Sequence, residues 1–156
     1  MTFDDAALLL LSDPHHSVGV GATEEEIESA SQTLRAPISG GYRTFLRRFG
    51  WGGVPAYRLY GLGGDVPKRF HLVLITESER TEMCPQVPEH LLPIMNDGGG
   101  NLVCLDTKAS PDEPPVVIWY HDDPDGSEQV PASEAPDFLS WFAKILAERG
   151  EGRTGP

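Results

Sequence analysis

The chain has 156 residues, which suits one domain with a hydrophobic core of its own. Its 24 acidic and 12 basic side chains give a formal net charge of −12, which disfavours nucleic acid and anionic membranes as partners. No apolar run approaches the ~18 residues of a membrane span, no signal peptide is visible, and two cysteines make no disulfide framework, so we expect a cytoplasmic protein.

The N-terminal part is predicted to be helical. Residues 3–11 suit a short helix and residues 15–21 a linker, so residues 1–21 are expected to be an N-terminal extension. The next helix is expected to begin at Thr23, because Thr23 and Glu26 have the spacing of a capping box. Its apolar face is expected to consist of Ile27, Ala30 and Leu34.

A second amphipathic helix is predicted after Pro37. Apolar residues at positions i, i+3, i+4 and i+7 predict its buried stripe, which consists of Tyr42, Phe45, Leu46 and Phe49. Three arginines lie off this stripe and are expected to be solvated, namely Arg43, Arg47 and Arg48. A glycine-rich segment ends the helix, and residues 56–62 have the pattern of a strand.

The segment 65–82 leaves two alternatives open. Its apolar spacing suits a helix, and Pro67 fits a first helical turn, so a helix is favoured. Residues 72–76 could instead form a strand.

The region 91–106 has the pattern of an antiparallel hairpin. Two apolar runs, residues 91–95 and 102–105, flank a cluster of Gly, Asn and Asp residues. Three consecutive glycines predict a tight connection with at least one positive φ, and the neighbouring Asp and Asn side chains are expected to cap it. The residues of this motif are Asp97, Gly98, Gly99, Gly100, Asn101 and Asp106.

The C-terminal part is predicted to complete the sheet and to end in a helix. Residues 116–121 suit a buried strand, residues 122–127 an acidic turn and residues 129–131 a short edge strand. The last helix is expected over residues 133–149, followed by a disordered tail over residues 150–156. Its apolar face is expected to consist of Phe138, Trp141, Phe142 and Ile145.

The order of these elements shows no alternation of strand and helix. It therefore predicts an α+β fold with an antiparallel-rich mixed sheet, packed against the N-terminal helices and the C-terminal helix. The main domain is expected over residues 22–149.

Residue types that carry catalysis or bind metals are present without the spacing that such sites need. The histidines fit no zinc motif, and the acidic turn after His121 lacks the acids that a calcium loop requires at its first and last positions. Cys104, His121 and the acids Asp106 and Asp122 are a conceivable nucleophilic set, but a cysteine between apolar strand residues is usually a small buried hydrophobe. We therefore expect neither an enzyme nor a cofactor.

The region around the glycine-rich hairpin resembles the SUKH superfamily, in which an "LPI…DGGGN…LD" signature recurs. Other segments agree in order: the Tyr42–Gly50 helix end, Tyr60-Gly61-Leu62, the strand from Val116, and Phe138-Leu139 in the last helix. The resemblance covers roughly residues 22–146. Members of this superfamily include fungal cell-wall-synthesis regulators linked to killer-toxin resistance and many bacterial toxin-immunity proteins.

The resemblance implies a protein that works by binding another protein. One interpretation is an immunity protein that neutralises a basic toxin domain, for example a nuclease, and the other is a regulatory or scaffold module of the same fold. The acidity gives mild support to the immunity interpretation, although solubility by itself would also explain an acidic composition. The sequence leaves the oligomeric state open. Trp51 lies between glycines and suits either a core or an interface position. The candidate partner-binding residues are Trp51, Asp97, Asp106, Asp122, Asp123 and Asp125.

Overall fold

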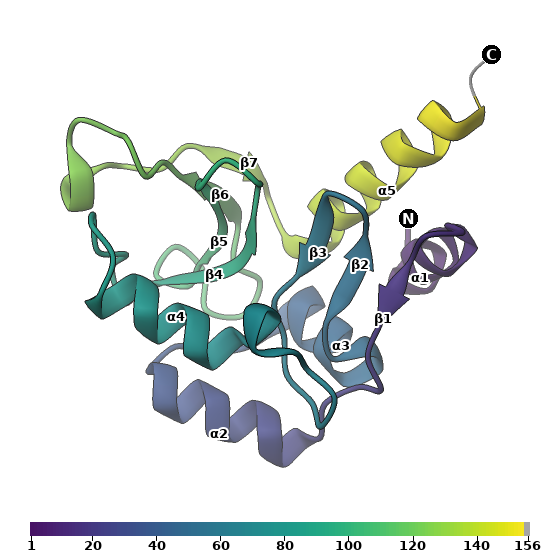
Figure 1. Cartoon of the computed structure of the whole chain (residues 1–156), viewed down its shortest axis with the longest axis horizontal. Coiled ribbons are helices and arrows are strands. Elements are labelled where there is room, and N and C mark those ends of the chain that lie inside the picture. The colour runs from purple at the N-terminus through teal and green to yellow at the C-terminus, as the bar shows by residue number, and fades with distance from the viewer. Residues whose placement is uncertain (155–156) are drawn as a thin grey trace.

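Helices and strands occupy most of the chain in the computed structural model, which describes residues 1–154 (Figure 1). Within these residues there are five α-helices and seven strands. The helices are α1 (Phe3–Ser12), α2 (Glu24–Leu34), α3 (Gly40–Phe49), α4 (Leu72–Thr81) and α5 (Phe138–Thr154). The strands are β1 (Ser17–Val18), β2 (Gly52–Val54), β3 (Tyr57–Leu59), β4 (Leu91–Asn96), β5 (Leu102–Asp106), β6 (Val116–Trp119) and β7 (Ser133–Ala135).

The strands form two sheets, in which every ladder is antiparallel. One has the order β1-β2-β3 and the other β4-β5-β6-β7. The register of β4 against β5 shifts between Pro93 and Met95, and within the shifted stretch the carbonyl of Ile94 accepts a hydrogen bond of 2.8 Å from the Tyr60 amide. This bond joins the two sheets. The α+β prediction is confirmed, whereas the expected single mixed sheet is replaced by two antiparallel ones.

Helices α2 and α3 follow their sequence patterns closely. The Thr23 hydroxyl accepts a hydrogen bond from the Glu26 amide, and the Glu26 carboxylate accepts one from the Thr23 amide, so the predicted capping box is confirmed. The apolar faces are buried as predicted, with Ile27, Ala30 and Leu34 on α2 and Tyr42, Phe45, Leu46 and Phe49 on α3.

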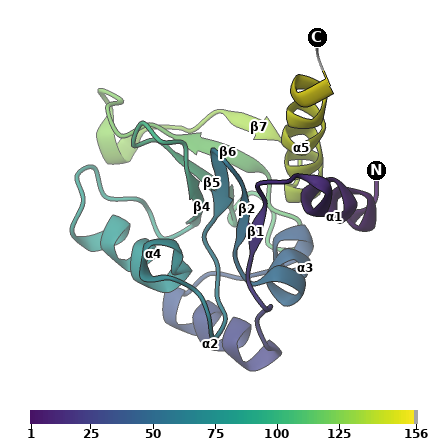
Figure 2. The ribbon, with the colours of Figure 1, turned by 45° about the vertical axis from the view of Figure 1, so that its right-hand side comes forward.

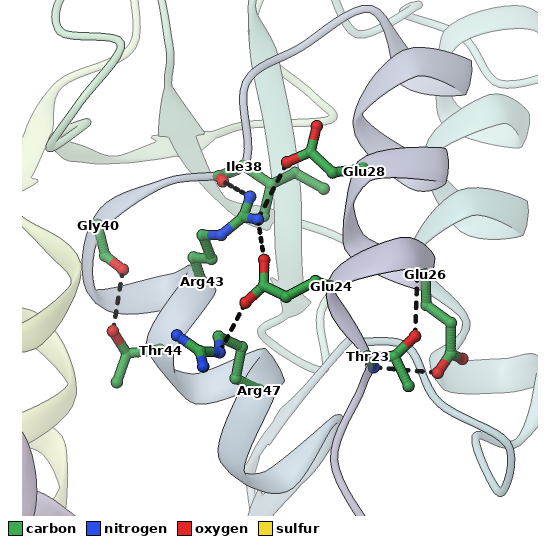
Figure 3. Close-up of polar contacts among 9 residues, drawn as sticks. All are labelled: Thr23, Glu24, Glu26, Glu28, Ile38, Gly40, Arg43, Thr44 and Arg47. Atoms are coloured by element: carbon green, nitrogen blue, oxygen red, sulfur yellow. Dashed lines mark hydrogen bonds and ion pairs between the residues drawn. The ribbon is translucent and has the colours of Figure 1, made fainter.

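The arginines of α3 are ion-paired, which corrects the expectation that they are merely solvated. Arg43 contacts both Glu24 and Glu28 of α2 and donates a 3.0 Å hydrogen bond to the carbonyl of Ile38, and Arg47 contacts Glu24 at 2.7 Å (Figure 3). The hydrogen bond from Arg43 lowers the pKa of Glu24. Ion pairs at such exposed positions add little to stability, so they orient α2 on α3 more than they stabilise the fold.

Aromatic rings join α3 to α5 in the core. Phe45 is fully buried, and its ring centroid lies 5.6 Å from Phe142 and 6.0 Å from Phe138. Tyr42 is also fully buried and donates a 2.6 Å hydrogen bond from its hydroxyl to the carbonyl of Tyr60. The hydroxyl is therefore not left without a hydrogen-bond partner in the core. The predicted apolar face of α5 is buried as well, so the amphipathic spacing of α5 is confirmed.

The N-terminal helix packs against the last one (Figure 2). Ala6, Ala7 and Leu10 of α1 have no exposed surface and belong to the main core. Asp13, which follows α1 and is 1% exposed, accepts a 2.5 Å hydrogen bond from Nε of Arg149 on α5. The two ends of the chain are therefore held together by an ion pair as well as by apolar packing.

Several predicted boundaries differ from the structure. The segment 65–82 contains a 3₁₀ turn at Lys68–Phe70 and then helix α4, so the helix alternative is correct but begins later than Pro67 suggested. The strand predicted over residues 56–62 is shorter, and β1 and β2 were not predicted.

The C-terminal elements are also displaced from their predicted positions. The edge strand is β7 rather than residues 129–131, and α5 begins at Phe138 rather than at residue 133. Helix α5 continues to Thr154, into the part expected as a tail, and residues 155–156 of that tail lie outside the described residues.

Candidate partner-binding groove

The glycine-rich turn joins β4 to β5, which confirms the predicted hairpin. Gly98 and Gly100 have φ values of +93° and +96°, as expected for a tight connection. Side chains fix the turn from inside: Oδ1 of Asn96 accepts the Gly98 amide at 2.8 Å, and Oδ1 of Asp97 accepts the amides of Gly99 and Asn101 at 2.8 and 3.2 Å. Asp97 therefore caps the turn as predicted, whereas the second cap is Asn96 and not the expected Asn101, whose side chain contacts His121.

The turn also touches the loop that follows β6. Oδ1 of Asn101 accepts the His121 amide at 3.2 Å and lies 2.8 Å from Nδ1 of the same histidine. A Cβ on Gly100 would lie 3.1 Å from that ring. The absent side chain of Gly100 therefore allows the two loops to meet at one end of the sheet.

The candidate acids fall into two groups that lie apart. Asp122, Asp123 and Asp125 follow His121 in the loop beside the glycine-rich turn, where Asp97 also lies. Asp106 pairs with Leu91 at the other end of the hairpin, and its Oδ1 accepts the amides of Lys108 and Ala109.

Asp106 is thus a loop cap at the far end of the sheet, and the structure separates it from the other acids with which the sequence analysis grouped it. The strands explain this: Asp106 and Asp97 lie at opposite ends of a hairpin whose strands rise about 3.4 Å per residue.

Trp51 has an internal role in the structure. Its ring is half-buried and stacks on Phe70, with centroids 5.8 Å apart, and its indole N–H donates a 3.0 Å hydrogen bond to Asp65. These contacts attach the segment before β2 to the loop before α4. Contact of Trp51 with a partner stays a prediction, and its geometry is that of a packing residue.

A groove lies between the four-stranded sheet and α5, and we call it the carboxylate groove. Its floor begins with Met95, Val103 and Ile118, which are register partners and form one row across β4, β5 and β6. The wall is one face of α5, where Trp141, Lys144, Ile145 and Glu148 follow each other at helical spacing. The volume is about 270 Å³.

Charged side chains lie around this apolar floor. Three carboxylates line the groove, those of Asp97 from the glycine-rich turn, Glu134 from β7 and Glu148 from α5. Lys144 contributes the opposite charge, and all four side chains belong to exposed residues. The groove therefore has an apolar floor and a charged rim, a distribution that also occurs in protein–protein interfaces.

Of the four charged residues that line the groove, only Asp97 was predicted from the sequence to be a partner-binding residue. The signal for the others was weak but present: Lys144 and Glu148 flank the apolar stripe of α5 at positions i+3 and i+7 from Trp141. Glu134 carries no local signal, because its place beside α5 follows from the pairing of β7 with β6.

A second hollow lies between α2 and α4, which run side by side (Figure 1). It has a volume of about 400 Å³ and is lined by Glu25, Glu26 and His71 together with small and aliphatic residues. It includes no Phe, Tyr or Trp ring, so it lacks the kind of anchor that concentrates binding energy in an interface.

The residues considered for nucleophilic chemistry do not form a site. Cys104 has no exposed surface, and burial raises the pKa of its thiol far above the ordinary value, with Glu79 adding to the effect. His121 is exposed and its ring is held by Asn101. Over residues 1–151 no cluster of three or more His, Cys, Asp or Glu side chains is arranged to hold a metal ion.

The two cysteines are expected to differ sharply in reactivity. In the native protein an aromatic disulfide reagent should modify one thiol, that of exposed Cys84, because only a thiolate reacts and Cys104 is buried and protonated. In urea two thiols should react, and Cys104→Ala should remove the second. Rapid modification of both thiols in the native protein would contradict the buried position of Cys104.

None of the described helices has the length and apolar character required to cross a bilayer.

A protein-family model described as SMI1-KNR4 cell-wall, one of the SUKH group, matches residues 8–147. The match begins inside α1 and includes the glycine-rich hairpin and most of α5. No curated protein matches the chain. Because the family model covers most of its length, the chain belongs to the SMI1-KNR4 family of the SUKH superfamily.

Proposed function

We propose that this protein is an immunity-type binding protein, which neutralises a toxin domain of a bacterial polymorphic toxin system by direct contact in the cytoplasm. Its family includes toxin-immunity proteins. The observation that carries the proposal is the carboxylate groove, where an apolar floor is surrounded by Asp97, Glu134 and Glu148. That combination suits protein recognition.

The expected partner is a basic toxin domain, for which a nuclease is the best candidate class. A nuclease that binds a phosphate backbone needs a positively charged surface. A protein with a formal net charge of −12 is attracted to such a surface over several ångströms, and complementary charge raises the rate of association. The same groove would serve a regulatory or scaffold module of this family, which is the alternative function.

The test is co-expression with a toxin domain encoded beside this protein. Cells that make the toxin domain alone should stop growing, and cells that also make this protein should grow, with the two proteins co-purifying as a complex. A toxin domain inactivated by mutation provides the control for expression load. If cells die although this protein is soluble, or if no toxin is recovered with it, the immunity function is wrong and the scaffold function takes its place.

A further inference from the structure

We propose that the carboxylate groove binds an extended segment of the toxin whose side chains alternate between basic and apolar. This rests on the proposed immunity function and adds the chemistry of the contact. The basic side chains would meet Glu134, Glu148 and Asp97, and the apolar ones would lie over the row of Met95, Val103 and Ile118.

The charge of the groove favours a cation. Three carboxylates and one ammonium group line it, so its net charge is negative. The ion pairs of the described side chains use other acids, such as Glu24 and Glu28 with Arg43, and none of them includes Glu134, Glu148 or Lys144. Within residues 1–151, the two glutamates therefore have no intramolecular ion pair that a basic partner would have to displace.

The floor of the groove favours apolar side chains between the cations. Ile118 and Tyr57 are half-buried, and they lie beside the buried rings and chains of Trp141, Ile145 and Met95. Covering such surface contributes about 25 cal/mol per Å² of apolar area removed from water. A purely cationic segment would leave this contribution unused, so the groove should prefer a segment that carries both chemistries.

The layout of the groove favours an extended segment. The floor row runs across β4, β5 and β6, and Glu134 and Ala135 of the neighbouring strand β7 also line the groove. In an extended segment successive side chains point to opposite sides, so the apolar ones can lie on this floor while the long basic ones reach the carboxylates at the rim.

A defined peptide tests the groove without the toxin. Titration of the ¹⁵N-labelled protein with an alternating lysine–leucine peptide should shift the indole signal of Trp141 and the amide signals of residues 144–148. The indole signals of Trp51 and Trp119 should stay in place, because neither residue lines the groove. A scrambled peptide of the same composition and an alternating glutamate–leucine peptide should bind more weakly.

Variants that remove charges from the groove test whether its carboxylates attract the peptide and its lysine repels it. The double variant Glu134→Gln, Glu148→Gln should bind the lysine–leucine peptide about twofold to thirtyfold more weakly, since two exposed ion pairs at about 0.2–1 kcal/mol each are lost. Lys144→Gln should bind it about twofold more tightly, because it removes a repelling charge. The matched control, Glu25→Gln with Glu82→Gln, changes the net charge equally with exposed acids outside the groove and should have little effect. Equal weakening by the control, or tighter binding by the groove variant, would overturn the proposal.

A second set of measurements uses the toxin domain itself, and it distinguishes a failure of the groove inference from a failure of the immunity function. If the toxin is neutralised and its dissociation constant is the same with wild-type protein and the groove double variant, the groove inference is wrong while the immunity function stands. If the peptide binds at the groove with the expected signs but no toxin is neutralised, the immunity function is wrong while the preference of the groove stands.

Discussion

Gly100→Val is expected to lower the free energy of unfolding by about 1–3 kcal/mol from backbone strain alone, because a β-branched residue is strained at positive φ. Gly100 has a φ of +96°, and an added Cβ would also lie 3.1 Å from the His121 ring. The effect should therefore lie at or above the upper end of that range. Equilibrium unfolding in urea measures it, through the midpoint at constant slope.

The neighbouring glycines provide matched controls in the same turn. Gly98 also has a positive φ, but an added Cβ would meet nothing within 4 Å, so Gly98→Val isolates the strain from the contact with His121. Gly99 is not at positive φ, and its nearest neighbour would be Oδ1 of Asp97 at 3.5 Å, so Gly99→Val should cost least. Equal losses for all three would show that the turn does not depend on these conformations.

The hairpin was predictable because its signals are local. The two apolar runs, the glycines and the capping residue Asp97 are contiguous in sequence, and a turn of this kind depends on little else. The same holds for α2 and α3, whose capping box and apolar stripe are set by residues three or four positions apart. Where the determinants lie within one element, sequence reasoning placed that element correctly.

Strand β2 was missed because two of its three residues are glycines, which normally indicate a loop. Gly52 and Gly53 are the first two residues of β2, with φ values of +110° and +153°. An added Cβ on Gly52 would lie 2.0 Å from the carbonyl oxygen of Ser17, and one on Gly53 would lie 2.1 Å from that of Tyr57. These glycines are required by the close approach of β1 and β3, which is a tertiary cause that a single-strand pattern does not contain.

The candidate site was predictable in kind and only partly in position. Acidity and family resemblance favoured a surface for a basic partner, and Asp97 does line the groove. Glu134 and Glu148 lie far from Asp97 in sequence, and they come together through the packing of α5 on the sheet. Trp51 was an equally plausible anchor in the sequence, but its stacking on Phe70 depends on a fold that its glycine neighbours do not reveal.

The acids of the β6–β7 loop are expected to control how fast the toxin domain binds. The triple variant Asp122→Asn, Asp123→Asn, Asp125→Asn should slow association about tenfold at low salt, since steering by charge raises association rates by about 10–10³-fold. Asparagine at position 123 keeps the oxygen that accepts the Asp125 amide at 2.8 Å, so the loop should hold its shape. Stopped-flow mixing at several ionic strengths measures the effect.

The salt dependence and the dissociation rate distinguish steering from contact. The Debye length is about 10 Å at 0.1 M salt and about 3 Å at 1 M, so the difference between wild type and the loop triple variant should shrink as salt is added. Dissociation should hardly change in that variant, whereas in the groove double variant, Glu134→Gln with Glu148→Gln, it should speed up because contacts in the bound state are lost.

A control triple variant, Glu25→Gln, Glu77→Gln, Glu82→Gln, changes the net charge equally with exposed acids outside the groove and the loop. If that control slows association as much as the loop variant does, only the net charge of the protein steers the toxin. If neither variant slows it, charge does not guide the encounter, and binding must then depend on the apolar floor of the groove.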